Sequence, residues 1–186
     1  TRDIIKSQKL YGNKTSKFKL GATQISMRSK IRRFDPHICI HLASYITPND
    51  SFDESKKLID SNISLLISIL DGLKESNLKY FINTGTFAEY SKDKNKLSPA
   101  YLYAATKTAS RPFIEYYSNL LKFKYCTVIP YTIYGGVDSQ KKIIDLIFDS
   151  IGSEIPLKLS PGNQILDFIH IDDVIGYYLY LIKNKS

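Results

Sequence analysis

The chain has 186 residues, 43% hydrophobic and 24% charged, a composition that excludes a disordered protein and suits one domain, or one domain with a small appendage. Its net charge of +8 comes from scattered lysines, not from a basic stripe interleaved with aromatic side chains, which disfavours nucleic-acid binding and favours anionic small molecules. No apolar stretch approaches membrane-spanning length, no signal peptide is visible, and Cys39 and Cys126 lie in apolar runs typical of reduced core thiols, so the sequence predicts a cytoplasmic protein with no membrane partner.

Apolar runs alternate with helical patterns along the chain. The predicted strands are 17–20, 36–43, 79–84, 125–130 and 166–171, and the predicted helices are 22–34, 51–76, 99–122, 141–151 and 172 onward. Ser51 and Glu54 have the spacing of a capping box at the start of the second helix. Residues 7–17 read as a flexible segment and residues 131–136 as a loop, with a domain boundary near its glycines. Strands alternating with helices predict an α/β fold with a doubly wound parallel sheet of the Rossmann type.

Acid–base chemistry is indicated where one predicted helix begins. Tyr103 and Lys107 are four residues apart, so they share a helix face, and Thr86 follows the preceding predicted strand. A nearby ammonium favours the phenolate and lowers the pKa of a tyrosine from about 10. We therefore expect Tyr103 to exchange a proton with a substrate oxygen that the Thr86 hydroxyl orients, while Lys107 lowers the pKa of Tyr103 and holds ribose hydroxyls of a cofactor.

Spacing alone does not single out this pair. Tyr90 and Lys94 are also four residues apart, but they fall in a charged loop-like run, so context favours the later pair. Taken alone, Tyr103 reads equally well as a surface tyrosine packed on its helix. His41 reads better as a strand residue with a satisfied ring than as a catalytic base. Helix-start carboxylates at 172–173 are explained by the helix dipole, and no metal site is predicted.

The order of short blocks along the chain resembles the extended short-chain dehydrogenase/reductase superfamily of sugar-nucleotide epimerases, dehydratases and reductases. The blocks are IHLAS at 40–44, Asn62 in the long helix, FINTGTFAEY at 81–90, the Tyr103/Lys107 pair, YTIYGG at 131–136 and ILDFIHIDDV at 165–174. The opening TRDIIK resembles the segment after the second strand in CDP-abequose synthase-like sugar-nucleotide reductases. The resemblance implies a partial NAD(P)-binding Rossmann domain at 1–135 and a partial substrate-binding region at 136–186.

The resemblance also implies roles for individual residues. The catalytic residues would be Thr86, Tyr103 and Lys107. Cofactor contacts would come from Arg2, Leu42, Ala43, Ser44, Asn62, Thr84, Tyr103, Lys107 and Tyr131, and substrate contacts from Thr86, Phe87, Thr132 and Leu166. Arg2 suits the 2′-phosphate of NADP better than the free ribose of NAD, so NADP is slightly favoured.

Several departures from the family pattern narrow these expectations. The glycine-rich pyrophosphate loop of the family is not in this sequence, so we expect a fragment, incomplete at the N-terminus, that by itself is inactive and binds NADPH poorly. Phe87 and Ala88 stand where 4,6-dehydratases carry an Asp–Glu pair, which disfavours water elimination. Ile129 and Leu166 stand where the family often has arginine, and Thr132 where it often has asparagine. Without the arginine at 166, the sequence does not show which residue would bind the diphosphate of the nucleotide.

The resemblance thus implies an NAD(P)-dependent reductase or epimerase that acts on a nucleotide-linked sugar, with a CDP-linked 4-keto-deoxy sugar as one candidate. A non-catalytic Rossmann-fold binding or scaffold module derived from the family is the alternative. The helices at 51–76 and 99–122 resemble those that pair in family dimers, which implies a homodimer. The sugar, the nucleotide, the choice between reductase and epimerase, and the choice between NAD and NADP stay open.

Overall fold

The computed structural model describes residues 24–93, 95–136, 141–163 and 165–185. The chain divides between Val128 and Ile129 into two compact units. The first unit is built on a parallel sheet of β1 (Ile38–His41), β2 (Tyr80–Thr84) and β3 (Lys124–Val128), in the order β1-β2-β3. Its register pairs Ile38 with Tyr80 and Tyr80 with Lys124. The first four residues of β2 are all buried, as expected for a central strand covered on both faces.

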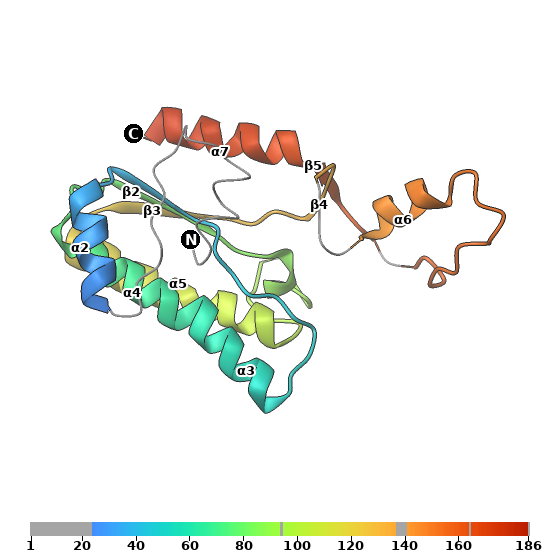
Figure 1. The fold of residues 1–186 in the computed structure, drawn as a ribbon, viewed down its shortest axis with the longest axis horizontal. Coiled ribbons are helices and arrows are strands. Elements are labelled where there is room, and N and C mark those ends of the chain that lie inside the picture. Colours follow the sequence, from blue (N-terminus) through green and yellow to red (C-terminus); the bar gives the residue numbers. More distant parts are fainter. Residues whose placement is uncertain (1–23, 94, 137–140, 164, 186) are drawn as a thin grey trace. The chain divides into compact units, whose positions relative to one another are not determined.

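Helices cover the sheet of the first unit. They are α2 (Gln24–Phe34), α3 (Phe52–Ile59), η1 (Asp60–Ser64), α4 (Leu65–Gly72), η2 (Leu73–Glu75), η3 (Phe87–Glu89) and α5 (Leu102–Leu121). Figure 1 shows α3, α4 and α5 lying along one face of the sheet. The apolar stripes of α4 and α5 meet β2 in a core of Leu66, Leu70, Leu73, Leu78, Phe81, Ile114, Tyr117 and Phe123. This burial of helix stripes against a central strand positions the amino end of α5 beside the end of β2.

The predicted helix at 51–76 is confirmed, with two local differences. Its middle turn, η1, is a π-helix, so the helix face shifts at Asn62. The predicted capping box at its start is only half formed: Ser51 Oγ accepts the Glu54 N–H at 3.5 Å. The Glu54 carboxylate instead accepts the Tyr45 hydroxyl at 2.6 Å and pairs with Lys57 at 2.6 Å, because these stronger donors lie within its reach.

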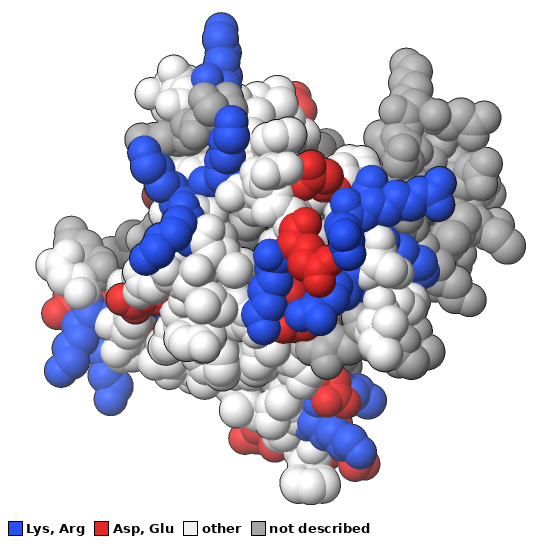
Figure 2. All heavy atoms as spheres, turned by 90° about the vertical axis from the view of Figure 1, so that its left-hand side faces the viewer, with Lys and Arg blue, Asp and Glu red and all other residues white. Residues whose placement is uncertain are grey.

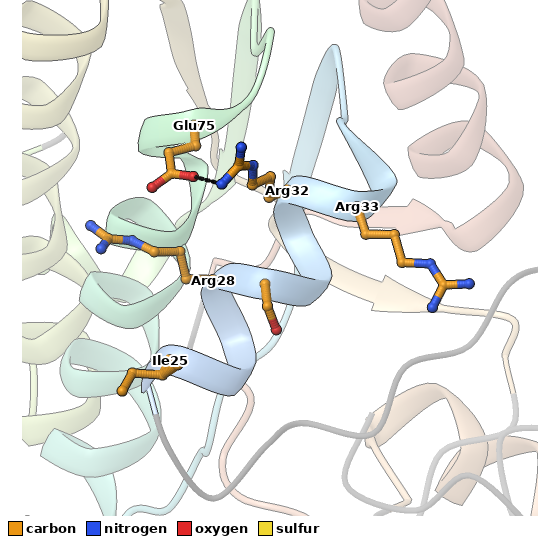
Figure 3. Close-up of a pocket in the computed structure, with 6 residues that line it drawn as sticks. Ile25, Arg28, Arg32, Arg33 and Glu75 are labelled. Carbon is orange, nitrogen blue, oxygen red and sulfur yellow. Dashed lines mark ion pairs between the residues drawn. The ribbon is translucent and has the colours of Figure 1, made fainter.

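Basic residues of α2 pack against acidic residues of the neighbouring helices. Gly72 permits the close approach, since a Cβ there would lie 2.6 Å from Ile31 Cδ1. Arg32 pairs with Glu75 at 2.8 Å, as Figure 3 shows, and Arg28 pairs with Asp71 at 3.4 Å. The space-filling view of this face shows blue and red side chains interleaved (Figure 2). The positive charge of α2 is therefore partly balanced within the unit.

A hollow of about 450 Å³ lies against α2, and it is lined by Ile25, Arg28, Ser29, Arg32, Arg33 and Glu75. None of these residues belongs to the site that the sequence predicts.

The second unit contains a two-stranded parallel sheet. Its elements are β4 (Thr132–Tyr134), α6 (Ile143–Ser150), β5 (Phe168–His170) and α7 (Ile171–Lys185). Thr132 pairs with Phe168 and Tyr134 with His170, so the prediction of a loop over 131–136 is wrong for the three residues of β4. Gly135 follows with φ of 86°, and a Cβ there would lie 2.1 Å from His170 Nε2. Glycine is therefore required where β4 ends.

The other predicted elements of the described chain appear at nearly the expected positions. The helix expected at 99–122 begins three residues later, at Leu102, and the strand expected at 36–43 is confined to Ile38–His41. The two units divide slightly before the predicted boundary at 135. The strand expected at 17–20 and the flexible segment expected at 7–17 lie outside the described residues.

Candidate active site

The predicted site residues of the first unit gather where its parallel strands end. Residues at the carboxyl ends of parallel strands share one edge of the sheet, which is where ligands bind in open α/β folds. After β1, Leu42, Ala43 and Ser44 are exposed, with Leu42 at 62%. Thr84, the last residue of β2, is followed by Gly85, whose N–H donates to the Val128 carbonyl at 2.8 Å, and by the buried Thr86. The exposed loop at 42–44 and the buried hydroxyl of Thr86 therefore lie at the same edge of the sheet.

The predicted acid–base pair lies on α5, which packs against η1 and η3. Tyr103 and Lys107 are one turn apart on this helix and are buried, with exposures of 7% and 4%. Burial lowers the pKa of Lys107 to about 8, and the negative charge of Glu89 acts in the opposite direction. The reading of Tyr103 as a surface tyrosine is therefore wrong. The amino end of α5 holds a phenol and a desolvated amine within one helical turn.

The protonation of Tyr103 differs from the expectation. Its pKa is raised, chiefly by burial, with smaller upward effects from Tyr101 and Glu89 and a downward effect from a hydrogen bond with Ser44. The pKa of Tyr103 is thus raised where the sequence predicted a lowered one, because burial outweighs the hydrogen bond with Ser44 that favours the phenolate. Tyr103 is therefore a phenol at neutral pH and is ready to donate a proton.

Asn62 connects the loop after β1 to α5. Its side-chain oxygen accepts the Tyr45 N–H at 2.7 Å, and its amide donates to the Tyr45 carbonyl at 3.0 Å and to Thr106 Oγ1 at 2.9 Å. Thr106 in turn donates to the Tyr103 carbonyl at 2.7 Å. Asn62 is only 2% exposed, so these contacts give it a positioning role. The predicted contact of Asn62 with a cofactor stays a prediction.

His41 is buried at the end of β1, and its ring is only half satisfied. Nδ1 lies 3.4 Å from Asn83 Oδ1, and Asn83 donates onward to Thr127 at 3.4 Å. Nε2 has no hydrogen-bond partner among the described residues. Burial, and next the positive charge of Lys107, lower the pKa of His41 to about 4. The ring is therefore neutral near pH 7, as a strand residue requires, but the expectation of a fully satisfied ring is wrong.

One polar residue of this region escaped the sequence interpretation. Glu89 is fully buried, and its carboxylate contacts both the Thr86 backbone and Arg111 of α5. The signal was present, because Thr86 and Glu89 have the same capping-box spacing as Ser51 and Glu54. Here both halves of the box are formed.

The remaining predicted residues lie directly after Thr86, in the second unit, or outside the described residues. Phe87 is 42% exposed on η3. Tyr131, Thr132 and Leu166 belong to the second unit, and Arg2 lies outside the described residues. Across the part of the chain that the structure describes, no group of three or more His, Cys, Asp or Glu side chains is arranged to hold a metal ion. No helix within those residues is long and apolar enough to span a membrane.

Comparison with protein families decides the wider assignment. The model of the NAD dependent epimerase/dehydratase family matches residues 7–186. The chain belongs to this family. A CDP-abequose synthase of Yersinia pseudotuberculosis is 33% identical over 164 residues, covering 88% of this chain and 57% of that protein. A CDP-abequose synthase of Salmonella typhimurium is 28% identical, covering 68% of this chain and 42% of that protein. The chain thus spans about half the length of these curated relatives.

A solved structure agrees on the fold. The UDP-glucuronic acid 4-epimerase of Bacillus cereus, in complex with UDP-glucuronic acid and NAD, superposes with a TM-score of 0.80 at 19% identity. The match covers 96% of this chain and 59% of that one. The predicted family and the Rossmann-type α/β fold are both confirmed. The relatives found are enzymes of sugar nucleotides, and members of the family use NAD.

Proposed function

We propose that the complete protein is an NAD(P)-dependent reductase or epimerase of a nucleotide-linked sugar, with Thr86, Tyr103 and Lys107 as its acid–base centre. The observation that carries the proposal is the burial of Tyr103 and Lys107 one turn apart on α5, beside the strand end that bears Thr86. Burying an amine lowers its pKa at a cost in stability, and such groups cluster at functional sites.

The donor set fits the nicotinamide end of a dinucleotide. Lys107 would bind the ribose hydroxyls through its ammonium, and the exposed residues 42–44 offer an apolar surface at the same strand edge. A bound nicotinamide supplies or accepts the hydride. NADP is the proposed preference because Arg2 suits a 2′-phosphate, and comparing the KM values of NADPH and NADH tests it.

The residues of the chain handle the proton. In a reduction, Tyr103 donates its phenolic proton to the keto oxygen as the carbon receives hydride, which leaves an alcohol and a phenolate. The Lys107 ammonium stabilises that phenolate until solvent returns a proton. The Thr86 hydroxyl, which accepts the Ala88 N–H at 3.4 Å, still carries a hydrogen to donate to the same oxygen. An epimerase would run the same step in both directions.

A reductase is the preferred reading. Ala88 provides no carboxylate after Thr86, so water elimination lacks an acid–base pair here. Relatives at 33% and 28% identity are CDP-abequose synthases, which makes a CDP-linked 4-keto-deoxy sugar the first substrate to test. The expected contacts from Phe87, Thr132 and Leu166 concern this sugar nucleotide and are part of the proposal.

The decisive experiment removes one oxygen from Tyr103. Tyr103→Phe in the complete protein should lower turnover of the 4-keto sugar nucleotide by about 10²–10⁴-fold, since that is the usual contribution of a positioned proton donor. Tyr125→Phe is the matched control, because Tyr125 is 39% exposed on β3 and belongs to neither the site nor the proposed dimer face. Consumption of reduced nicotinamide, followed by absorbance, measures both. Unchanged turnover of Tyr103→Phe would favour a non-catalytic module of the same fold.

A homodimer through α3–α4 and α5 is a further part of the proposal. The outward face of α5 carries Phe113, Tyr116 and Leu120, with exposures of 36%, 62% and 50%. An apolar stripe at this spacing on an otherwise polar helix face suits pairing with a second copy.

A further inference from the structure

Glu89 is the buried carboxylate of the region, and all of its described partners belong to the site or to α5. Its side chain has 0% exposure in η3, directly after Thr86. Oε1 accepts the Thr86 N–H at 2.8 Å. Oε2 accepts Arg111 Nε at 2.8 Å and the Thr108 hydroxyl at 3.4 Å. The Glu89 carboxylate therefore hydrogen-bonds both to the segment after β2 and to α5, the helix that carries the acid–base pair.

These bonds set the orientation of Thr86. Its backbone is extended, with φ of −147° and ψ of 145°, and its side chain and carbonyl also take part in the turn. The Glu89 N–H donates to the Thr86 carbonyl at 3.1 Å as a backbone bond of the turn. The Thr86 side chain accepts from the η3 backbone, which completes the reciprocal box. Because the N–H, the carbonyl and the hydroxyl oxygen of Thr86 all form hydrogen bonds, its backbone is held in one conformation and its side chain leaves the backbone in one fixed direction. Shortening or removing the Glu89 side chain would release it.

The ion pair is not explained by stability alone. A buried pair gains little over apolar residues of similar volume because both charges lose their hydration. Arg111 has a side-chain exposure of 25%, and its Nη2 is buried without a hydrogen-bond partner among the described residues. Its guanidinium carbon lies 5.8 Å from the centre of the Tyr90 ring. Because burying the pair costs hydration free energy, holding the turn in place does not by itself explain why a charged residue stands at Glu89. The negative charge itself therefore points to a function.

The charge of Glu89 reaches the acid–base pair. It raises the pKa of Lys107 and that of Tyr103, so it favours the ammonium and the phenol. The neutral ring of His41 does not compete for this role. Within the described chain, the charged or titratable groups that shift the pKa values of the pair are Glu89 on η3 and Tyr101 before α5. Lys107 in turn acts on the neutral ring of His41 on β1, and Arg111 lies one turn beyond Lys107 on α5.

We propose that Glu89, held by Arg111, is a positioning residue for the acid–base centre: it fixes the orientation of Thr86 and keeps the Lys107–Tyr103 pair in its protonated form. The inference rests on the proposed function, since it assigns a role within that reaction. Two variants separate the two parts of the role. Glu89→Gln keeps the reach to the Thr86 N–H and removes the charge, whereas Glu89→Asp keeps the charge and shortens the reach.

The test is the pH dependence of kcat in the complete protein. Activity needs the ammonium of Lys107 and the phenol of Tyr103, so it falls as pH rises through their pKa values. We call this fall of kcat at high pH the alkaline limb. Removing the negative charge lowers both pKa values, so Glu89→Gln should move the alkaline limb to lower pH by about one unit. Glu89→Asp should leave the limb in place and lower kcat by about 10–100-fold, because misplacing a donor by about 1 Å can cost about 10²-fold.

Arg111→Gln provides an independent variant that leaves Glu89 in place. Removing the balancing cation strengthens the field of Glu89, so the alkaline limb should move to higher pH. The inference is overturned if the alkaline fall of kcat in Arg111→Gln stays in place or moves to lower pH. It is also overturned if both Glu89 variants have the pH profile and the kcat of the wild type. Tyr103→Phe separates this failure from a failure of the proposed function: if Tyr103→Phe is inactive while the Glu89 variants behave as wild type, only the role of Glu89 is refuted.

Discussion

Replacing Lys107 with methionine should stabilise the protein while abolishing its chemistry. Lys107 is 4% exposed, and its pKa falls from 10.5 to about 8, net of the attraction of Glu89. At about 1.4 kcal/mol per pKa unit, holding the ammonium in the folded state at neutral pH costs about 3 kcal/mol. Methionine has a similar length and no charge, so Lys107→Met should raise the free energy of unfolding by about 1–3 kcal/mol. Turnover should be lost, because the phenolate has no counter-charge.

The pH dependence of this gain has a definite sign. Between pH 8 and 10.5 the unfolded chain keeps the proton on Lys107 while the folded chain has lost it, so wild-type stability from this group rises with pH in that window. The advantage of Lys107→Met is therefore full below pH 8 and vanishes near pH 10.5. Urea unfolding followed by far-ultraviolet circular dichroism at pH 7 and pH 10 measures it. The exposed Lys56→Met is the control and should change little at either pH. A Lys107→Met protein less stable than wild type, or equally advantaged at both pH values, refutes the reasoning.

Two further variants test the framework around the site. Asn62→Ala leaves the Tyr45 N–H and carbonyl without their buried partner and frees Thr106, so it should lower the free energy of unfolding by about 2–4 kcal/mol in the same urea assay, whereas a change within 0.5 kcal/mol would contradict the positioning role. Leu120→Lys places a charge on the outward stripe of α5, so the proposed dimer should become a monomer in sedimentation velocity. Lys122→Gln is a nearby control. If the Leu120→Lys protein dimerises as the wild type does, this face is not the interface.

The sheet and the long helices are predictable because their signals are local and periodic. The apolar run around Ile40 and the run Tyr80–Thr84 identify two strands, and the spacing of Leu66 and Leu70 identifies the buried face of a helix. In contrast, β4 is three residues long, and it becomes a strand only by pairing with β5, more than thirty residues away. No local pattern in 131–136 carries that information.

The two capping-box patterns show a second limit of sequence reasoning. Ser51–Glu54 and Thr86–Glu89 are equivalent in spacing, yet only the second closes. Glu54 is drawn away by Tyr45 and Lys57, whereas Glu89 is buried where its nearest donors are the Thr86 N–H and Arg111. Spacing shows which bonds are within reach, and the competing donors that decide among them come from other parts of the fold.

The protonation of Tyr103 follows the same logic. Residue identity and spacing place a lysine one turn away and so predict a lowered pKa, but they do not report that both groups are buried. Burial penalises the phenolate and the ammonium alike. The next effect on the pKa of Lys107 is the charge of Glu89, whereas for Tyr103 it is the hydrogen bond with Ser44, with Glu89 adding a smaller upward effect. A phenol that keeps its proton until the keto oxygen takes it is the state that a reductase needs at the start of its cycle. If the proposed acid–base centre operates at this strand edge, its protonation depends on the buried carboxylate of Glu89 as well as on the tyrosine–lysine spacing.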